Sequence, residues 1–329
     1  MKAIVRSSYG SPDVLELRDI AKPVVKDDEV LVRVRASSVN TADIDYLRGR
    51  PTFARITPGL YGLRAPTNRV LGLNVAGQVE AVGKDVTGLR PGDQVFGDMT
   101  QHGFGAFAEY VSAPERAFAM QPAGMTYEDS ATLPHAAVLA LQALRSGRKI
   151  QPGHRVLING ASGSVGPFAV QIAKALGAEV TGVCSTAKMA FVQGFGADHV
   201  IDYAKEDFTR TGQRYDRILD VSAHRSIFAN RRVLNSGGTY VLIGGSSVRV
   251  LESTFLGPVI SLAGNRTMGI DWSWKPMKPE DVATLTRMID AGTVAPVIDR
   301  TYRLAEVADA LRYLEQGRAQ GKVVITVLE

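Results

Sequence analysis

The chain has 329 residues, room for about two domains, and its 45% hydrophobic and 22% charged residues are ordinary for a globular protein. A single cysteine, Cys184, excludes an intrachain disulfide and favours a reducing compartment. No apolar run reaches the about 18 residues of a membrane span, and residues 1–6 do not resemble a signal peptide. The net charge of +5 suits small anionic ligands better than nucleic acid. We therefore expect a cytoplasmic protein that binds neither nucleic acid nor a membrane.

The first third of the chain reads as short strands separated by turns. Val30 to Ala36 alternates apolar and charged residues, which predicts a strand with one buried face. The strands predicted in this region are 2–6, 30–36, 75–83, 94–97 and 106–111. Many short strands at regular spacing favour a compact, barrel-like β domain.

The pattern changes after about residue 122. Residues 127–145 read as helices rich in Ala and Leu, and apolar strands then alternate with helices. The strands predicted here begin at Arg155 and continue at 180–183, 200–202, 217–221, 239–243 and 266–270. Helices are predicted at 279–291 and 304–314, and a last strand at 323–327. Strand–helix alternation of this length predicts a doubly wound parallel sheet.

A glycine-rich turn follows the strand that begins at Arg155. Ala161, Gly163 and Gly166 have the spacing of the dinucleotide-binding fingerprint, with Ala in the first place. A pyrophosphate would bind the free N–H groups at the start of the following helix, and a side chain at Gly163 would block its approach. Gly166 would let that helix pack closely on the strand. By itself the turn could be an ordinary strand–helix turn, but the alternating elements around it favour a cofactor site.

The region about 20 positions beyond the fingerprint bears on cofactor choice, because NAD-selective folds place an acid there that binds the ribose. Residues 184–188 contain no acid. Ser185 and Thr186 could donate to a 2′-phosphate and Lys188 could neutralise it, which favours NADPH. Alternatively, Ser185 or Thr186 caps the next helix and Lys188 is solvated.

Several blocks together resemble the medium-chain dehydrogenase/reductase superfamily, and within it the zinc-independent quinone oxidoreductase and enone reductase branch. These blocks are 9–15, 28–34, 39–43, 71–83, 90–97, 105–110, the fingerprint turn and 196–203. The resemblance implies an α/β protein with a GroES-like, β-barrel-type catalytic domain and a Rossmann cofactor domain with a doubly wound parallel sheet. It implies a catalytic domain at 1–125, an NADPH-binding domain at 126–265, and a return to the catalytic domain at 266–329. A homodimer is often found in this branch.

The resemblance also assigns cofactor-binding residues. Lys188 and Tyr203 match positions that hold the 2′-phosphate, although Tyr203 could instead pack on a neighbouring helix. Ser185 matches the position that is acidic in NAD-dependent relatives, and Ile243 and Gly244 should lie along the nicotinamide half. The cofactor-binding residues predicted are Ala161, Ser162, Gly163, Ser164, Val165, Gly166, Ser185, Thr186, Lys188, Tyr203, Ile243 and Gly244.

The zinc ligands of metal-dependent relatives are missing from the sequence. Residues 40–43 lack the expected Cys, residues 72–74 lack His and Glu, and one cysteine cannot form a four-cysteine structural site. The five histidines are scattered, and only His102, in a glycine-rich loop, is a candidate to line the cleft. We therefore expect no metal site. Asn74 stands where zinc-free relatives often keep an acid, so its role is open.

Three residues are candidates for catalysis. Asn40 matches an active-site asparagine, expected to orient the substrate or the nicotinamide ribose. Tyr46 is a candidate donor to the forming oxyanion or packs against the β domain, and Asp43 is expected to order its loop rather than transfer protons. Without a Lewis acid, hydride addition to a quinone or enone is easier than alcohol oxidation, because the charge delocalises into an enolate.

The sequence therefore predicts an NADPH-dependent reductase of quinones or α,β-unsaturated carbonyls. The alternatives are a non-catalytic NADPH-binding regulator and a zinc-type alcohol dehydrogenase with atypical ligands. Two segments have open roles. Residues 269–274 carry both tryptophans and could wall the cleft, form a dimer contact or pack at a domain junction. The arginine-flanked insertion 51–66 could be a lid or a solvated loop.

Overall fold

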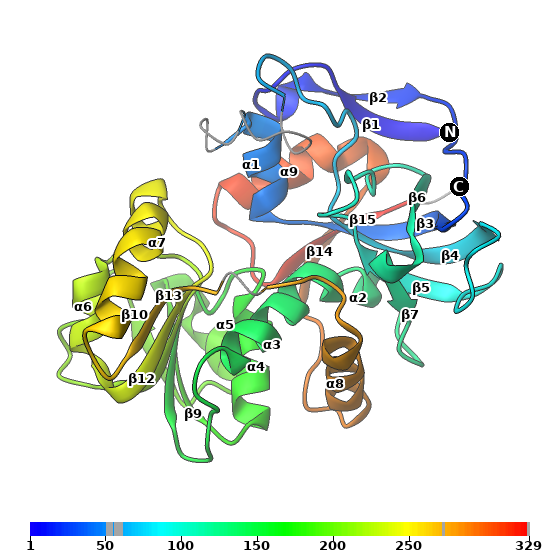
Figure 1. Ribbon diagram of the computed structural model, residues 1–329. Helices are drawn as coiled ribbons and strands as arrows, with labels where there is room; N and C mark the ends of the chain where they lie inside the picture. The colour runs from blue at the N-terminus through cyan, green and yellow to red at the C-terminus, as the bar shows by residue number, and fades with distance from the viewer. Residues whose placement is uncertain (51–54, 56–61, 272–273, 328–329) are drawn as a thin grey trace. The chain divides into compact units, whose positions relative to one another are not determined.

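The computed structural model describes residues 1–50, 55, 62–271 and 274–327. The chain divides into two compact units, which Figure 1 shows in blue to cyan with red and in green to yellow. Unit 1 comprises Met1–His135, Pro276–Ala283 and Ile298–Glu329, and unit 2 comprises Ala136–Lys275 and Thr284–Val297. Residues 126–135 therefore belong to unit 1, whereas the boundaries expected from sequence assign them to the cofactor domain. Residues 266–275 and 284–297 belong to unit 2, although the expected boundaries place them in the segment that returns to the catalytic domain.

Unit 1 is built on a seven-stranded sheet to which both ends of the chain contribute. Its seven strands run in the order β14 (Ile298–Arg303), β15 (Lys322–Thr326), β3 (Glu29–Val39), β4 (Asn74–Val82), β5 (Gln94–Asp98) and β7 (Phe118–Met120), with β6 (Tyr110–Pro114) against β3. A separate antiparallel pair joins β1 (Lys2–Arg6) and β2 (Leu15–Asp19). The helices assigned to this unit are α1 (Thr41–Arg48), α2 (Tyr127–Ser130) and α9 (Val307–Glu315), while α8 (Pro279–Asp290) contains the boundary between units. The GroES-like part of the prediction is confirmed.

Helix α1 is absent from the expectations, although its signals stand in the sequence. Asn40 is the N-cap, and the Asp43 carboxylate accepts the Asn40 backbone N–H at 2.8 Å. Gly49 ends the helix in the left-handed region, with φ of +61°. An Asn followed three residues later by an acid, with a glycine after the last turn, is a recognisable start and stop pattern.

The strand expected at 106–111 begins four residues later, at Tyr110. Residues 103–105 all have positive φ, including the non-glycine Phe104 at +66°. The chain then crosses to residues 71–72, where the Phe107 N–H donates to the Leu71 carbonyl at 2.9 Å. This turn postpones pairing with β3 until Tyr110.

Unit 2 is a doubly wound α/β fold, as predicted. Its parallel sheet has the order β10 (His199–Asp202), β9 (Glu179–Cys184), β8 (Arg155–Asn159), β11 (Tyr215–Asp220), β12 (Leu234–Leu242) and β13 (Thr267–Ile270). Its helices are α3 (Val138–Arg145), α4 (Gly166–Ala175), α5 (Met189–Gly194), α6 (Ile227–Arg232) and α7 (Ser247–Leu262). Helices α3 and α4 cover one face of the sheet, and α6 and α7 cover the other (Figure 1). The strand order reverses between β8 and β11, where this fold class forms its ligand crevice.

Candidate active site

The fingerprint turn has the shape that a pyrophosphate requires. The chain leaves β8 through Gly160, at φ of +83°, and α4 starts at Gly166. A Cβ on Gly166 would lie 2.3 Å from the Ala161 carbonyl carbon and oxygen, so glycine permits this close packing. A Cβ on Gly163 would meet only the Gly160 carbonyl oxygen, at 3.6 Å. The space beside Gly163 is therefore open, and the turn fits a dinucleotide.

A buried polar cluster fixes the strands beneath this turn. Asn159, the last residue of β8, donates from Nδ2 to Asp220 Oδ1 at 2.7 Å and to the Ser222 carbonyl at 2.9 Å. The Tyr240 hydroxyl donates to Asp220 Oδ2 at 3.1 Å, and burial raises the pKa of Asp220 to about 6. The Ile243 N–H donates to the Asp220 carbonyl at 2.9 Å, so Ile243 and Gly244 follow β12 beside the end of β11. Asn159 and Asp220 were not predicted from the sequence. The signal that could have revealed them is a polar residue at the end of an otherwise apolar strand.

The segments expected at the 2′-phosphate end lie together in unit 2. The Tyr203 N–H donates to the Cys184 carbonyl at 3.1 Å, which sets Tyr203 beside the start of 185–188. The Tyr203 side chain is 60% exposed, Ser185 and Lys188 are half-buried, and Thr186 is exposed. All four residues are therefore open to solvent or partly so.

An acid does reach this end, from the neighbouring strand. Asp202 closes β10, and its carboxylate accepts the Thr186 hydroxyl at 2.5 Å and the Ala204 N–H at 3.0 Å. The hydrogen bond from Thr186 lowers the pKa of Asp202, so the acid is ionised at neutral pH. In this structure the Thr186 hydroxyl hydrogen is thus used within the protein and is not available to a phosphate. Asp202 lies outside the window that the fingerprint spacing selects, so the sequence pattern did not reveal it.

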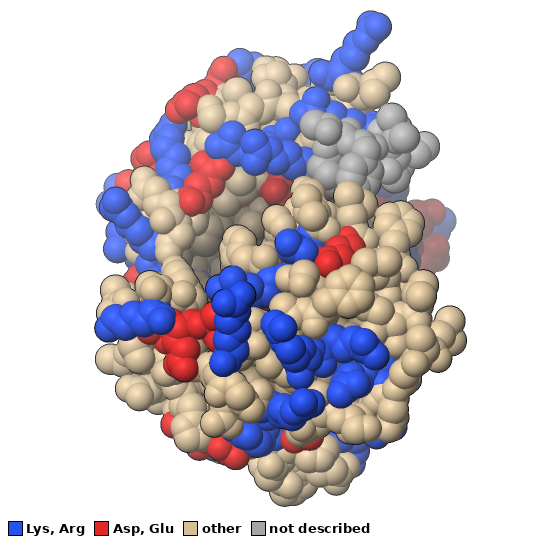
Figure 2. Space-filling model, turned by 90° about the vertical axis from the view of Figure 1, so that its left-hand side faces the viewer, with Lys and Arg blue, Asp and Glu red and all other residues tan. Residues whose placement is uncertain are grey.

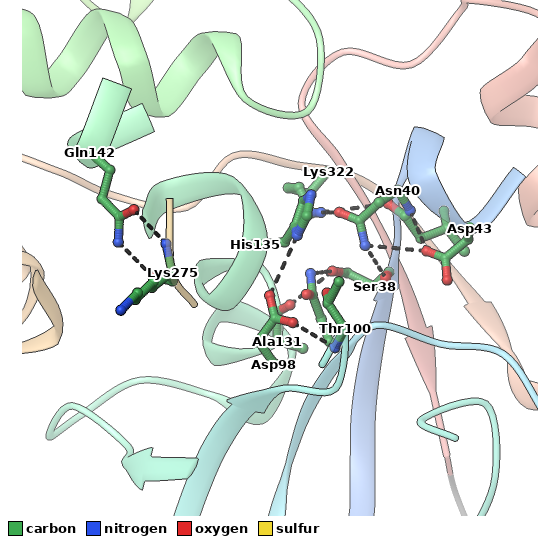
Figure 3. A network of polar contacts seen from close by, with 12 residues as sticks. Ser38, Asn40, Asp43, Asp98, Thr100, Ala131, His135, Gln142, Lys275 and Lys322 are labelled. Atoms are coloured by element: carbon green, nitrogen blue, oxygen red, sulfur yellow. Dashed lines mark hydrogen bonds and ion pairs between the residues drawn. The ribbon is translucent and has the colours of Figure 1, made fainter. Parts of the chain in front are cut away.

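In unit 1, Asn40 is the centre of a buried polar network (Figure 3). Its side chain is 3% exposed. Its Nδ2 donates to the Ser38 carbonyl at 3.1 Å and to Asp43 Oδ2 at 3.2 Å. Its Oδ1 accepts from Lys322 Nζ at 2.7 Å. Both amide hydrogens are therefore engaged, and only a lone pair on Oδ1 is left for a ligand.

Asp43 and Tyr46 follow Asn40 along α1. Burial raises the pKa of Asp43 to about 6, against the opposing hydrogen bonds from Asn40 and the charges of Lys322 and His135. The Tyr46 ring packs on Phe104, with 4.5 Å between centroids. Burial, reinforced by the charges of Asp43 and Asp98, raises the pKa of Tyr46 to about 12. The phenol therefore keeps its proton at neutral pH and can serve as a hydrogen-bond donor.

A row of buried polar residues crosses three neighbouring strands next to Asn40. Ser38 on β3 is in register with Asn74 on β4, and Asn74 with Asp98 on β5. Asn74 Nδ2 donates to Ser38 Oγ at 2.8 Å, and His135 Nδ1 lies 3.4 Å from Asp98 Oδ2. Asn74 is thus part of this row. Asp98, His135 and Lys322 were not predicted as site residues, and the one signal for Lys322 is a charge at the head of an apolar strand.

Two family models match the chain: the alcohol dehydrogenase GroES-like domain at residues 26–123 and the zinc-binding dehydrogenase at residues 195–325. The 2-methylene-furan-3-one reductase of Solanum lycopersicum is 32% identical over 336 residues, covering 99% of this chain and 79% of that protein. The chloroplastic NADPH-dependent alkenal/one oxidoreductase of Arabidopsis thaliana is 30% identical, with 99% and 79% covered. The structure of the quinone oxidoreductase from Coxiella burnetii superposes with a TM-score of 0.87 at 28% identity, covering 100% of this chain and 99% of that one.

The chain belongs to the medium-chain dehydrogenase/reductase superfamily. Within the superfamily it falls in the quinone oxidoreductase and enone reductase branch, as the sequence blocks predicted, and it is an oxidoreductase. Relatives of this kind use a nicotinamide cofactor, which matches the open turn at Gly163.

Zinc-dependent members of the medium-chain superfamily need a set of ligands in one place. Over residues 1–50, 55, 62–271 and 274–327, no group of three or more His, Cys, Asp or Glu side chains is arranged to hold a metal. His102 is half-buried in its loop, and His199 pairs with Glu179 at 2.7 Å. In the same described residues no helix combines the length and apolar character that a membrane span requires.

The two segments with open roles are described only in part. Most of the 51–66 insertion and Trp272 lie outside the described residues. Arg55, within the insertion, donates from its guanidinium to the Gly49 and Arg48 carbonyls at 2.9 Å each, so it binds the C-terminal end of α1. Trp274 is half-buried.

Proposed function

We propose that this chain is an NADPH-dependent reductase of quinones or α,β-unsaturated carbonyls that works without a metal. The observation that carries the proposal is the open space beside Gly163, in the turn before α4 at the reversal point of the doubly wound sheet. The reductase names of the similar proteins from Solanum lycopersicum and Arabidopsis thaliana support the substrate class. When bound, the cofactor supplies a hydride.

The residues of unit 1 would orient the substrate and stabilise its developing charge. Addition of a hydride to the β-carbon of an enone leaves negative charge on the carbonyl oxygen, which a hydrogen-bond donor stabilises. Tyr46 holds its proton at neutral pH and supports this role. Asn40 would act through the Oδ1 lone pair that the network leaves available. Among the described residues, no group of side chains is arranged to bind a metal ion, which supports a reaction without zinc.

NADPH is proposed over NADH. Lys188 and the exposed Tyr203, which lie beside the end of β9, support a 2′-phosphate site. The negative charge of Asp202 opposes the binding of a 2′-phosphate. However, its carboxylate is occupied by Thr186 and Ala204, and Lys205 Nζ lies 3.8 Å away, which reduces its repulsion of a phosphate.

A homodimer and a cytoplasmic location complete the proposal. Helix α7 carries several exposed apolar side chains beside β13, the edge strand of its sheet, which supports association with a second copy. The absence of cysteine pairs supports a reducing compartment.

The decisive experiment measures oxidation of NADPH, and separately NADH, by purified protein with an ortho-quinone and with a simple enone. We expect turnover with at least one of them, faster with NADPH and unchanged after treatment with a chelator. Tight NADPH binding without turnover on a broad substrate panel would favour the non-catalytic regulator. Stoichiometric zinc that is required for turnover would favour an alcohol dehydrogenase with atypical ligands.

A further inference from the structure

Lys322 is a fully buried lysine without a role in the reaction so far. It is the first residue of β15, and its side chain is 0% exposed. The next residue, Val323, is in register with Val39, which brings Lys322 beside Asn40. Its Nζ donates to Asn40 Oδ1 at 2.7 Å and lies 3.5 Å from the Val39 carbonyl (Figure 3). Lysine is rarely buried completely, because its ammonium loses its hydration.

The carboxamide of Asn40 lies between this cation and an anion. Its oxygen faces the Lys322 ammonium, and its nitrogen faces the Asp43 carboxylate at 3.2 Å. With the amide turned over, N–H groups would face the ammonium and the amide oxygen would face the carboxylate. Both contacts would then be repulsive. Lys322 and Asp43 together therefore select one of the two amide orientations.

The network also has hydrogen-bonding capacity to spare. Lys322 has three N–H hydrogens and, among the described residues, two acceptors. Asp43 Oδ1 is buried and has no partner among the same residues. The network therefore leaves one hydrogen of the ammonium and one carboxylate oxygen without a protein partner among the described residues.

We propose that Lys322 is a positioning residue of the reaction: with Asp43, it holds the Asn40 carboxamide in the orientation that Asn40 presents to the substrate or the nicotinamide ribose. The inference rests on the proposed function, because it takes Asn40 as an active-site residue.

The charge state of the network decides how firmly the amide is held. Asp43 on α1 and Asp98 at the end of β5 act on Lys322 through their charges, and His135 acts on Asp43 and pairs with Asp98. Burial lowers the pKa of Lys322 to about 7 and raises the pKa of Asp43 to about 6. A neutral amine could accept from the amide nitrogen, and a protonated carboxyl could donate to the amide oxygen. Either change would admit the reversed amide, so the orientation is held best between the two titrations.

The test compares Lys322→Met with Lys322→Arg, Lys322→Gln and a matched control on the same strand, Thr326→Val. Thr326 donates to the Tyr302 carbonyl at 3.2 Å and has no part in the network. For Lys322→Met we expect kcat to fall about 10- to 100-fold, as misplacement of an orienting group does, with the Kd for NADPH within about twofold. The alkaline decline of kcat near neutral pH should disappear, Lys322→Arg should recover part of the activity, and Thr326→Val should match the parent protein.

A second readout does not depend on turnover. The side-chain amide NMR signals of Asn40 should shift with pH in the parent protein, and this shift should be absent or displaced in Lys322→Met or, if that variant does not fold, in Lys322→Gln. If Lys322→Met lowered kcat, NADPH affinity and melting temperature together and left the pH profile of kcat unchanged, Lys322 would be only structural. If the parent protein reduces no enone or quinone, the proposed function fails. The NMR titration still decides whether Lys322 holds the amide, and an unaltered titration in the variant overturns the inference.

Discussion

Gly163 and Gly166 belong to one turn, but the two positions require glycine for different reasons. At Gly166 the limit lies inside the protein, because the Ala161 backbone leaves no room for a Cβ. At Gly163 the protein leaves ordinary van der Waals space, so the limit would come from a ligand. This contrast separates a folding requirement from a binding requirement within a single motif.

Alanine substitutions at these two positions should therefore differ in effect. Gly163→Ala should leave the melting temperature unchanged and weaken NADPH binding by about tenfold or more, which corresponds to about 1.4 kcal/mol. Gly166→Ala should lower the free energy of unfolding by about 1–3 kcal/mol, as overpacking does. Thermal unfolding and isothermal titration calorimetry on both variants check the pair. An equal loss of stability in both would remove the evidence for a ligand at Gly163.

Lys188 offers a residue-scale test of cofactor choice. Lys188→Ala should raise the Kd for NADPH about 5- to 50-fold, because a charge-assisted bond to the 2′-phosphate is worth about 1–2 kcal/mol. The Kd for NADH should stay within about twofold. The control is Lys174→Ala, in which the removed ammonium pairs with Asp198 directly before β10, and both Kd values should stay within about twofold. Equal losses for both cofactors in Lys188→Ala would contradict the phosphate assignment.

At the scale of elements, α7 exposes several large apolar side chains along its length. Its exposed large apolar residues are Val248, Leu251, Phe255, Leu256, Val259 and Leu262. A Cβ on Gly257 would lie 2.5 Å from the Met268 carbonyl, so the opposite face of the helix packs directly on β13. Figure 2 shows one face of the molecule, on which uncharged surface alternates with groups of Lys and Arg side chains.

This exposed face should contribute to a dimer interface. Phe255, 69% exposed, is the test position, and Phe255→Glu should convert a dimer to a monomer without lowering the melting temperature of the fold. Val24→Glu, at another strongly exposed apolar position, is the control and should not change the mass. Light scattering coupled to size exclusion measures the result. A monomeric parent protein, or a dimer that persists in Phe255→Glu, would refute this interface.

At the scale of the whole molecule, buried titratable groups in both units should give stability a defined pH dependence. Asp43 in unit 1 and Asp220 in unit 2 have pKa values raised by burial to about 6, from 3.8. Between these values the folded state binds more protons than the unfolded state, so the free energy of unfolding decreases as pH rises. The pKa of Lys322 is lowered by burial from 10.5 to about 7, so in that window the unfolded state binds more protons and stability increases with pH.

Urea unfolding across pH should show these two windows. Asp220→Asn should flatten the decrease between about pH 4 and 6, and Lys322→Met should flatten the increase above about pH 7. Thr326→Val should keep both slopes. Slopes that are unchanged in Asp220→Asn and Lys322→Met would show that other groups dominate the titration.

The sequence by itself determined the alternation of strands and helices, the fingerprint turn and the family, because these depend on local spacing and on short ordered blocks. Asn40 and Asp43 could be named because they fall within one such block, and Tyr46 because it follows that block by three residues. The tertiary structure alone decided their surroundings. Lys322 reaches Asn40 only through the pairing of β15 with β3, and Asp202 reaches Thr186 only because β10 lies beside β9. Contacts of this kind join residues far apart in the chain, and the register of neighbouring strands fixes them, which no local pattern encodes.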